Sequence, residues 1–204
     1  VTGWSAATLA EFAALAARGV DGVVMTPGTE IFREHVPEPW RMAEEMCRVT
    51  RPGGLVVVAP HPDDESLGCG GLMVQALRAG RAVCVVILSD GCGSHPNSQA
   101  YPAERLRAQR EAETLRAVAE LGLDPACVTF LRLPDGAVPH EGAPAQAVAE
   151  RIAGIAEACG AGAVLTTWGG DPHCDHKGAA AIVATVPLVL TGCSGSGPGV
   201  LTRL

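Results

Sequence analysis

The feature that most constrains the fold is a repeating alternation of short apolar runs with helix-forming stretches, which begins at Leu55. The runs are rich in Val, Leu and Ile and lack polar interruptions, which is typical of strands buried on both faces. We predict strands over residues 55–59, 83–88, 128–133 and 163–167, and helices over residues 70–78, 103–121, 144–158 and 177–184. This alternation predicts an α/β fold with a mostly parallel sheet and helices on both faces. In such folds the functional groups lie in loops at the carboxyl ends of strands.

The two ends of the chain fall outside this alternation. Residues 1–54 contain a predicted amphipathic helix over residues 6–18 and a shorter one over residues 41–49, so we interpret them as an N-terminal flanking helical segment. Residues 55–186 form the main domain, with Pro187 expected to end its last helix early. Residues 187–204 are an irregular Gly- and Ser-rich tail for which we predict no regular structure.

Composition indicates a globular protein and argues against several kinds of partner. Hydrophobic residues make up 48% of the chain and charged residues 18%, which suits a folded domain. The net charge of −7 provides no basic surface for nucleic acid, and no apolar stretch approaches the length of a membrane span. The eight cysteines form no Cys-x-x-Cys pair, and the N-terminus lacks the pattern of a signal peptide. We therefore expect reduced thiols and a cytoplasmic location.

A dense polar cluster follows the first predicted strand, in the order His61, Pro62, Asp63, Asp64 and Glu65. Pro62 suits the first position of a helix, which would place the acids in its opening turn. Three consecutive carboxylates repel one another unless a positive charge lies among them. His61 and Asp64 are three positions apart and can converge on one point, whereas Asp63 must face another way. A divalent cation would balance this charge.

A second polar cluster, residues 171–176, follows the strand predicted over residues 163–167 and ends in His176. Together, His61, Asp64 and His176 would supply two imidazoles and one carboxylate, leaving an open position for water, as catalytic zinc sites require. Zinc lowers the pKa of bound water to about 7 and so provides a nucleophile at neutral pH. Each cluster alone is more often a helix N-terminus or a solvated loop, but both at strand-to-helix loops favour a metal site.

The motif Val-Val-Val-Ala-Pro-His-Pro-Asp-Asp-Glu-Ser-Leu-Gly-Cys-Gly-Gly at residues 56–71, with His-Cys-Asp-His at residues 173–176, resembles the PIG-L/LmbE-like family of zinc-dependent N-acetylglucosaminyl de-N-acetylases. The resemblance continues in the helix from Arg110 to Gly122 and in Leu-Pro-Asp-Gly at residues 133–136. It covers roughly residues 55–184. It implies a Rossmann-like α/β fold and a hydrolase acting on an N-acetylated amino sugar or its conjugate.

The resemblance also implies roles for residues at matching positions. His61, Asp64 and His176 match the metal ligands, expected to hold one Zn²⁺ or another divalent cation. Asp63 matches the general base that takes a proton from the attacking water. His173 matches the histidine that stabilises the tetrahedral oxyanion or protonates the leaving amine.

Further positions are implied to contact substrate or to orient the ligands. Arg110 and Asp135 match residues near the sugar, and Asp175 is expected to orient one of its neighbouring histidines. A surface pair between Arg110 and Glu113 is the alternative interpretation for that helix. Cys174 lies beside the ligands in sequence, and we interpret it as a packing residue.

Two further hypotheses stay open beside the small-molecule deacetylase. The tail after residue 186 resembles nothing in the family, so the fold is expected to be truncated at its C-terminus, and the chain would then be a non-catalytic metal-binding remnant. The third hypothesis is an iron-dependent oxygenase with the same two-histidine, one-carboxylate set. The strand–helix alternation argues against it, because such oxygenases use β-barrel-like scaffolds.

Overall fold

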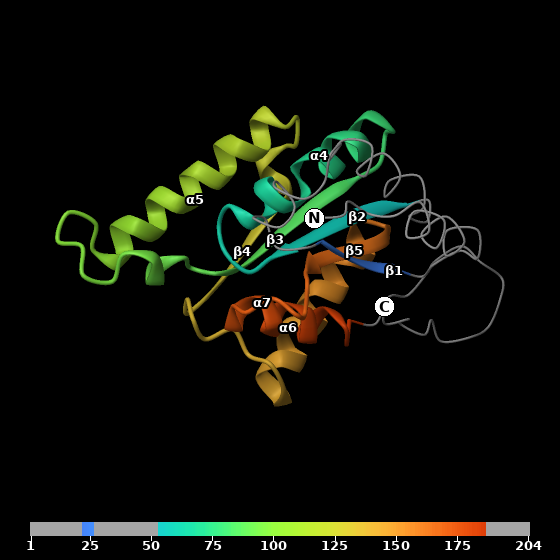
Figure 1. Cartoon of the computed structure of the whole chain (residues 1–204). Helices are drawn as coiled ribbons and strands as arrows, with labels where there is room; N and C mark the ends of the chain where they lie inside the picture. Colours follow the sequence, from blue (N-terminus) through green and yellow to red (C-terminus); the bar gives the residue numbers. More distant parts are fainter. Residues whose placement is uncertain (1–21, 27–52, 187–204) are drawn as a thin grey trace, which may run out of the picture.

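A computed structural model describes residues 22–26 and 53–186 of the chain. Within these residues, five parallel strands form one sheet in the order β1-β5-β2-β3-β4 (Figure 1). The strands are β1 (Gly22–Thr26), β2 (Gly54–Ala59), β3 (Val83–Ser89), β4 (Val128–Leu133) and β5 (Ala161–Thr167). The α-helices are α4 (Asp64–Arg78), α5 (Ala103–Glu120), α6 (Gly142–Ala158) and α7 (Cys174–Val183), with short 3-10 turns η1 (Cys92–Ser94) and η2 (Pro125–Cys127).

The central strand β2 is buried along its whole length and divides the core into two layers. Successive side chains of a strand point to opposite faces of the sheet. Leu55, Val57 and Ala59 accordingly pack with α4 and with Val118 of α5, whereas Val56 and Val58 pack with α6 and α7. Figure 1 shows α4 and α5 on one side of the sheet and α6 and α7 on the other. The predicted α/β fold with helices on both faces is confirmed.

Three helices begin earlier than predicted. Helix α6 begins at Gly142, not at residue 144. Helix α4 begins at Asp64, not at residue 70, and α7 begins at Cys174, not at residue 177. In α7 the His173 side chain accepts the Asp175 N–H and so caps the helix before its apolar face begins. As a result, each polar cluster extends from its loop into the first turn of a helix, α4 or α7. The helix then fixes the directions of the side chains on that turn.

Strand β1 was not predicted, because we interpreted residues 1–54 as a flanking helical segment. It pairs in parallel with β5, from Gly22 opposite Ala163 to Thr26 opposite Thr167. The helices predicted over residues 6–18 and 41–49 and the tail from residue 187 lie outside the described residues. The division into three segments and the C-terminal truncation therefore stay predictions. No helix in the described part is both long and apolar enough to cross a membrane.

The order of the strands determines where loops meet. The chain passes from β2 to β3 and β4 on one side, and then returns to place β5 on the other side of β2. Between β2 and β5 the direction of strand addition reverses, and in open parallel sheets ligands bind at such a point, beyond the carboxyl ends of the strands. Both polar clusters lie at this point, because one follows β2 and the other follows β5.

Candidate active site

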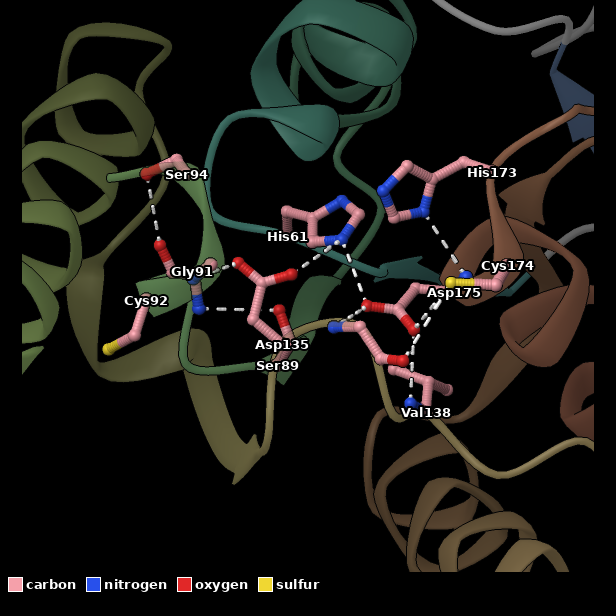
Figure 2. A network of polar contacts seen from close by, with 12 residues as sticks. His61, Ser89, Gly91, Cys92, Ser94, Asp135, Val138, His173, Cys174 and Asp175 are labelled. Carbon is pink, nitrogen blue, oxygen red and sulfur yellow. Dashed lines mark hydrogen bonds and ion pairs between the residues drawn. The ribbon is translucent and has the colours of Figure 1, made fainter. Parts of the chain in front are cut away.

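The predicted site residues come together at the carboxyl edge of the sheet. His61 and Asp63 lie in the loop after β2, and Asp64 opens α4. His173 precedes α7 and His176 lies in its first turn, on the loop that follows β5. Figure 2 shows the His61 and His173 rings side by side, with Asp175 and Asp135 close to His61.

Two imidazoles converge on a single oxygen atom of Asp64. The Nδ1 atom of His61 lies 3.1 Å from Asp64 Oδ2, and the Nε2 atom of His176 lies 3.3 Å from the same oxygen. The backbone N–H of His61 also donates to this oxygen, at 3.1 Å. Burial disfavours the ionised form of Asp64, but the hydrogen bonds and charges of His176 and His61 outweigh it and hold the pKa of this carboxyl well below its usual range.

The other nitrogen of each ring faces a second carboxylate. His61 Nε2 lies 3.1 Å from Asp175 Oδ2, and Asp175 is fully buried. His176 Nδ1 lies 3.1 Å from Asp171 Oδ2, an ion-pair distance, although the orientation does not meet the geometry of a hydrogen bond. Carboxylates on the outer nitrogens of metal-binding histidines fix the tautomer and direct the inner nitrogens toward the ion.

This arrangement fits a divalent metal. Ligands bound about 2.0–2.1 Å from a tetrahedral zinc ion lie about 3.3 Å from one another. The two contacts to Asp64 Oδ2, at 3.1 and 3.3 Å, match that separation. Two imidazoles and a carboxylate are also a donor set that zinc prefers. Two of the separations that a metal ion would need therefore suit His61 Nδ1, His176 Nε2 and Asp64 Oδ2.

The acidic surroundings affect the histidines directly. Burial acts to lower the pKa of His61 and of His176, but the Asp64 carboxylate outweighs it in both cases. Asp135 and Asp175 add to the effect at His61, and Asp171 adds to it at His176. Both histidines therefore have pKa values above the ordinary value of 6.5. A cation is favoured at this site, whether it is a proton or a metal ion.

His173 completes a cluster of three imidazoles. Its ring centre lies 4.7 Å from that of His61 and 5.1 Å from that of His176. Its Nδ1 atom accepts the backbone N–H of Asp175 at 3.2 Å. The ring itself is exposed, unlike those of the other two histidines. His173 is thus held through its Nδ1 atom, and its Nε2 atom can meet a ligand.

Three overlapping groups of possible ligands occur among the described residues, and all belong to this site. Their members are His61, His173 and His176 in the first; His173, Cys174 and Asp175 in the second; and His61, Asp135 and Asp175 in the third. Cys174, which we interpreted as a packing residue, is exposed, with its thiol 3.8 Å from the carbonyl oxygen of Gly136. Its position beside the histidines was expected, but its exposure does not fit a packing role.

Asp63 lies next to the metal-binding group but faces outward. Its carboxylate is 56% exposed, and its Oδ2 atom lies 3.1 Å from Arg110 Nη2 on α5. The same guanidinium donates to the carbonyl oxygen of Pro62 and, through Nη1, to Ser94 Oγ at 3.3 Å. Burial of the carboxyl and the charge of Asp64 raise the pKa of Asp63, and Arg110 opposes them.

Arg110 itself is held by close packing. Gly91 has a φ of 65°, and a Cβ atom at this position would lie 2.8 Å from Arg110 Nε and 3.0 Å from Pro62 Cδ. Only glycine therefore leaves room for the guanidinium beside the loop that carries Asp63. The alternative pairing of Arg110 with Glu113 is not found; Glu113 accepts a hydrogen bond from Gln109.

Asp135, expected near a sugar, closes the other side of the site. Its Oδ1 atom lies 3.5 Å from His61 Nε2, and its Oδ2 atom accepts the Gly93 N–H at 2.7 Å. It thereby connects the loop after β4 with the η1 turn after β3. Its side chain is largely buried, at 13% exposed.

Two site residues were missed from the sequence. Asp171 was recognised only as part of the second cluster, and its position five residues before His176 gave no indication of contact. Glu65 was counted with the other acids, but it is 1% exposed and points back into the loop. Leu67, two positions later, is apolar but 54% exposed. Residue type alone therefore did not predict which side chain of this turn is buried.

Comparison with known proteins finds one matching family and a related deacetylase. A family model described as GlcNAc-PI de-N-acetylase (PIG-L) matches residues 56–186, more than half of the 204-residue chain. The chain is also 30% identical over 156 residues to the 2'-N-acetylparomamine deacetylase of Streptomyces fradiae, covering 67% of this chain and 54% of that protein. A separate short similarity, 69% identity over 26 residues, links it to an uncharacterized methyltransferase of Mycobacteroides abscessus, covering 13% of this chain and 10% of that one.

Among solved structures, the fold is similar to that of the N,N'-diacetylchitobiose deacetylase from Pyrococcus horikoshii. The TM-score is 0.57 at 19% sequence identity, over 76% of this chain and 53% of that one. At this identity the similarity concerns the fold. The chain spans about half the length of each of the two deacetylases.

Proposed function

The chain belongs to the GlcNAc-PI de-N-acetylase (PIG-L) family, and from this we propose that it is a metal-dependent hydrolase that removes the acetyl group from an N-acetylated amino sugar or its conjugate. One observation carries the proposal. His61 and His176 direct their inner nitrogens at one oxygen of Asp64, and each outer nitrogen faces a carboxylate. A purely structural acidic cluster has no reason to orient two imidazoles in this way.

We assign the metal to His61, Asp64 and His176, and propose zinc because the donors and their separations suit it. When bound, the ion would polarise the acetamide carbonyl and activate a water molecule at neutral pH. Three protein ligands would leave the ion open to an outside ligand such as water, as catalytic zinc sites require. Other divalent ions with similar preferences would be accepted by the same donors.

Asp63 is the proposed general base. Its carboxylate is exposed at the edge of the site, and no helix N–H holds it. It is therefore available to accept the proton of the attacking water. Its partial burial and the Asp64 charge raise its pKa against the effect of Arg110, and a base whose pKa lies nearer the operating pH transfers protons more effectively.

His173 is the proposed partner of the oxyanion and the leaving amine. Because its Nδ1 atom accepts the Asp175 N–H, the neutral ring carries its proton on Nε2. That nitrogen lies on the side of the ring away from the Asp175 N–H (Figure 2). A donor there stabilises negative charge that develops only in the transition state, which is the requirement for acceleration.

For the substrate, we propose a small N-acetylated sugar that meets Asp135 and Arg110 at the two sides of the site. Asp135 offers a carboxylate 3.5 Å from His61 Nε2, suited to a sugar hydroxyl. Arg110 is engaged with Asp63 and would contact substrate from the same position. The named relatives deacetylate 2'-N-acetylparomamine and N,N'-diacetylchitobiose, which makes these two compounds the first to test.

The test is acetate release from a panel of N-acetylated sugars by zinc-loaded protein. We expect release by the unmodified chain and its loss in Asp63→Asn and His176→Ala. Matched controls are Asp124→Asn, at the turn before β4, and His140→Ala, an exposed histidine outside the cluster; both should stay active. Zinc binding without release from any compound would favour the non-catalytic remnant. Failure to bind any divalent metal would contradict the proposal.

A further inference from the structure

The backbone of Asp63 adopts a conformation that L-amino acids rarely take. Asp63 is the N-cap residue of α4, with φ 122° and ψ −34°. Among the described residues, Arg132 is the other non-glycine residue with positive φ. Such a conformation costs free energy and persists only where surrounding contacts impose it.

Asp63 also fails to do what an N-cap aspartate usually does. An aspartate at this position ordinarily turns its carboxylate back to accept an N–H from the first turn of its own helix. The Asp63 side chain makes no such bond, and its Oδ2 atom faces Arg110 instead. The rare backbone conformation thus occurs together with an unusual direction of the carboxylate.

Glu65 makes a direct contact with the backbone of Asp63. Its side chain is 1% exposed, and its Oε2 atom accepts the backbone N–H of Asp63 at 2.9 Å. Its Oε1 atom accepts the Ser66 hydroxyl at 2.7 Å, so both carboxylate oxygens are engaged. A buried glutamate is uncommon and requires such partners.

We propose that Glu65 is a positioning residue for Asp63, which it keeps in the positive-φ conformation so that the Asp63 carboxylate faces Arg110 at the edge of the site and does not cap α4. This inference rests on the proposed function, because it gives a role to the direction of the general base. The competing interpretation is that the negative charge of Glu65 only stabilises the N-terminus of α4 through the helix dipole.

The two interpretations differ in the property of Glu65 that they require. The first requires a side chain long enough to reach the Asp63 N–H, and the second requires its negative charge. Glu65→Gln keeps the reach and an acceptor oxygen but removes the charge. Glu65→Asp keeps the charge but is too short to meet the Asp63 N–H. Both variants retain a polar side chain, so both are expected to fold, which thermal unfolding and a count of bound zinc would verify.

We expect Glu65→Gln to retain kcat within about threefold, and Glu65→Asp to lose about 10–100-fold in kcat with little change in KM, as for a misplaced catalytic group. Crystal structures should show positive φ at residue 63 in Glu65→Gln and negative φ in Glu65→Asp. The proposal is overturned if Glu65→Asp stays active, if Glu65→Gln is equally impaired, or if φ at residue 63 is the same in both. If the unmodified chain releases no acetate, the proposed function fails, and the comparison of φ still decides the role of Glu65.

Discussion

Asp175 and His61 are 114 positions apart in the sequence, yet Asp175 Oδ2 lies 3.1 Å from His61 Nε2. The same buried carboxylate accepts the backbone N–H groups of Gly136 and Val138, at 2.7 and 3.0 Å. Burial disfavours its ionised form, but these two N–H groups and His61 outweigh burial and lower the pKa of Asp175. One side chain thus joins the loops that follow β2, β4 and β5.

We therefore expect Asp175→Asn to weaken both the metal site and the fold. The amide keeps the shape of the side chain but offers one acceptor oxygen where the carboxylate offers two, and His61 loses its charged partner. Zinc affinity should fall about 10–100-fold, and the midpoint of thermal unfolding should decrease. Competition with a chromophoric chelator measures the first and calorimetry the second, with Asp124→Asn as the control. Unchanged zinc affinity would show that Asp175 does not orient His61.

The sequence predicted that His61, Asp64 and His176 come together, but it did not predict all of their partners. Their role as metal ligands stays a prediction. His61 lies three positions before Asp64, the first residue of α4, so their spacing alone brings them together. The resemblance predicted that Asp175 would orient a neighbouring histidine, but in the structure it contacts His61, while Asp171 faces His176. These contacts depend on β5 lying beside β2, and strand order is a property of the whole sheet that no local pattern specifies.

The backbone also limits what a pattern can predict. The parallel sheet followed from apolar runs, because fully buried strands need them. Strand β1 was missed since its short run lies in a segment dominated by helix-forming stretches. The conformation of Asp63 was equally hidden, because positive φ at a non-glycine residue results from contacts such as that with Glu65 and not from residue preference.

Metal binding should weaken on acidification, and the loss should begin at a higher pH than it would with histidines of ordinary pKa. His61 and His176 must be neutral to bind a metal ion, and in the metal-free protein their pKa values are raised. Zinc affinity should therefore decrease as the pH falls, with the decline already under way above 6.5 and a limiting slope of about two protons per ion. Titration calorimetry at several pH values would measure this.

Asp171→Asn tests the cause of that dependence at one of the two histidines. Without the Asp171 charge, the pKa of His176 should fall, so the decline in affinity should begin at a lower pH. Affinity at high pH should also be weaker, because the carboxylate no longer orients the ring. An acid decline that does not move would show that Asp171 has no electrostatic effect on His176.

Removal of Arg110 should change the pH dependence of catalysis. Burial and Asp64 raise the pKa of Asp63, and Arg110 lowers it, so Arg110→Met should raise that pKa further. Because the base acts in its ionised form, the acid limb of kcat/KM should move to higher pH. Arg110→Lys, which keeps the charge, is the matched control and should move the limb less. A lower kcat/KM at every pH with an unmoved limb would indicate substrate contact alone.

The strain at Asp63 should be visible as a difference between two variants that both lack the carboxylate. Glycine accepts a φ of 122° without strain and alanine does not, so Asp63→Gly should unfold at higher urea concentration than Asp63→Ala. Glu141 provides the matched pair, because it is the N-cap residue of α6 with an ordinary φ of −158° and no side-chain cap. At position 141, the glycine variant should have a free energy of unfolding about 1 kcal/mol higher than the alanine variant. At position 63, the same difference should be larger by at least about 1 kcal/mol. Measurement on zinc-free protein keeps metal binding out of the comparison. Equal differences at the two positions would mean that residue 63 carries no strain, and the direction of its carboxylate would then need another explanation.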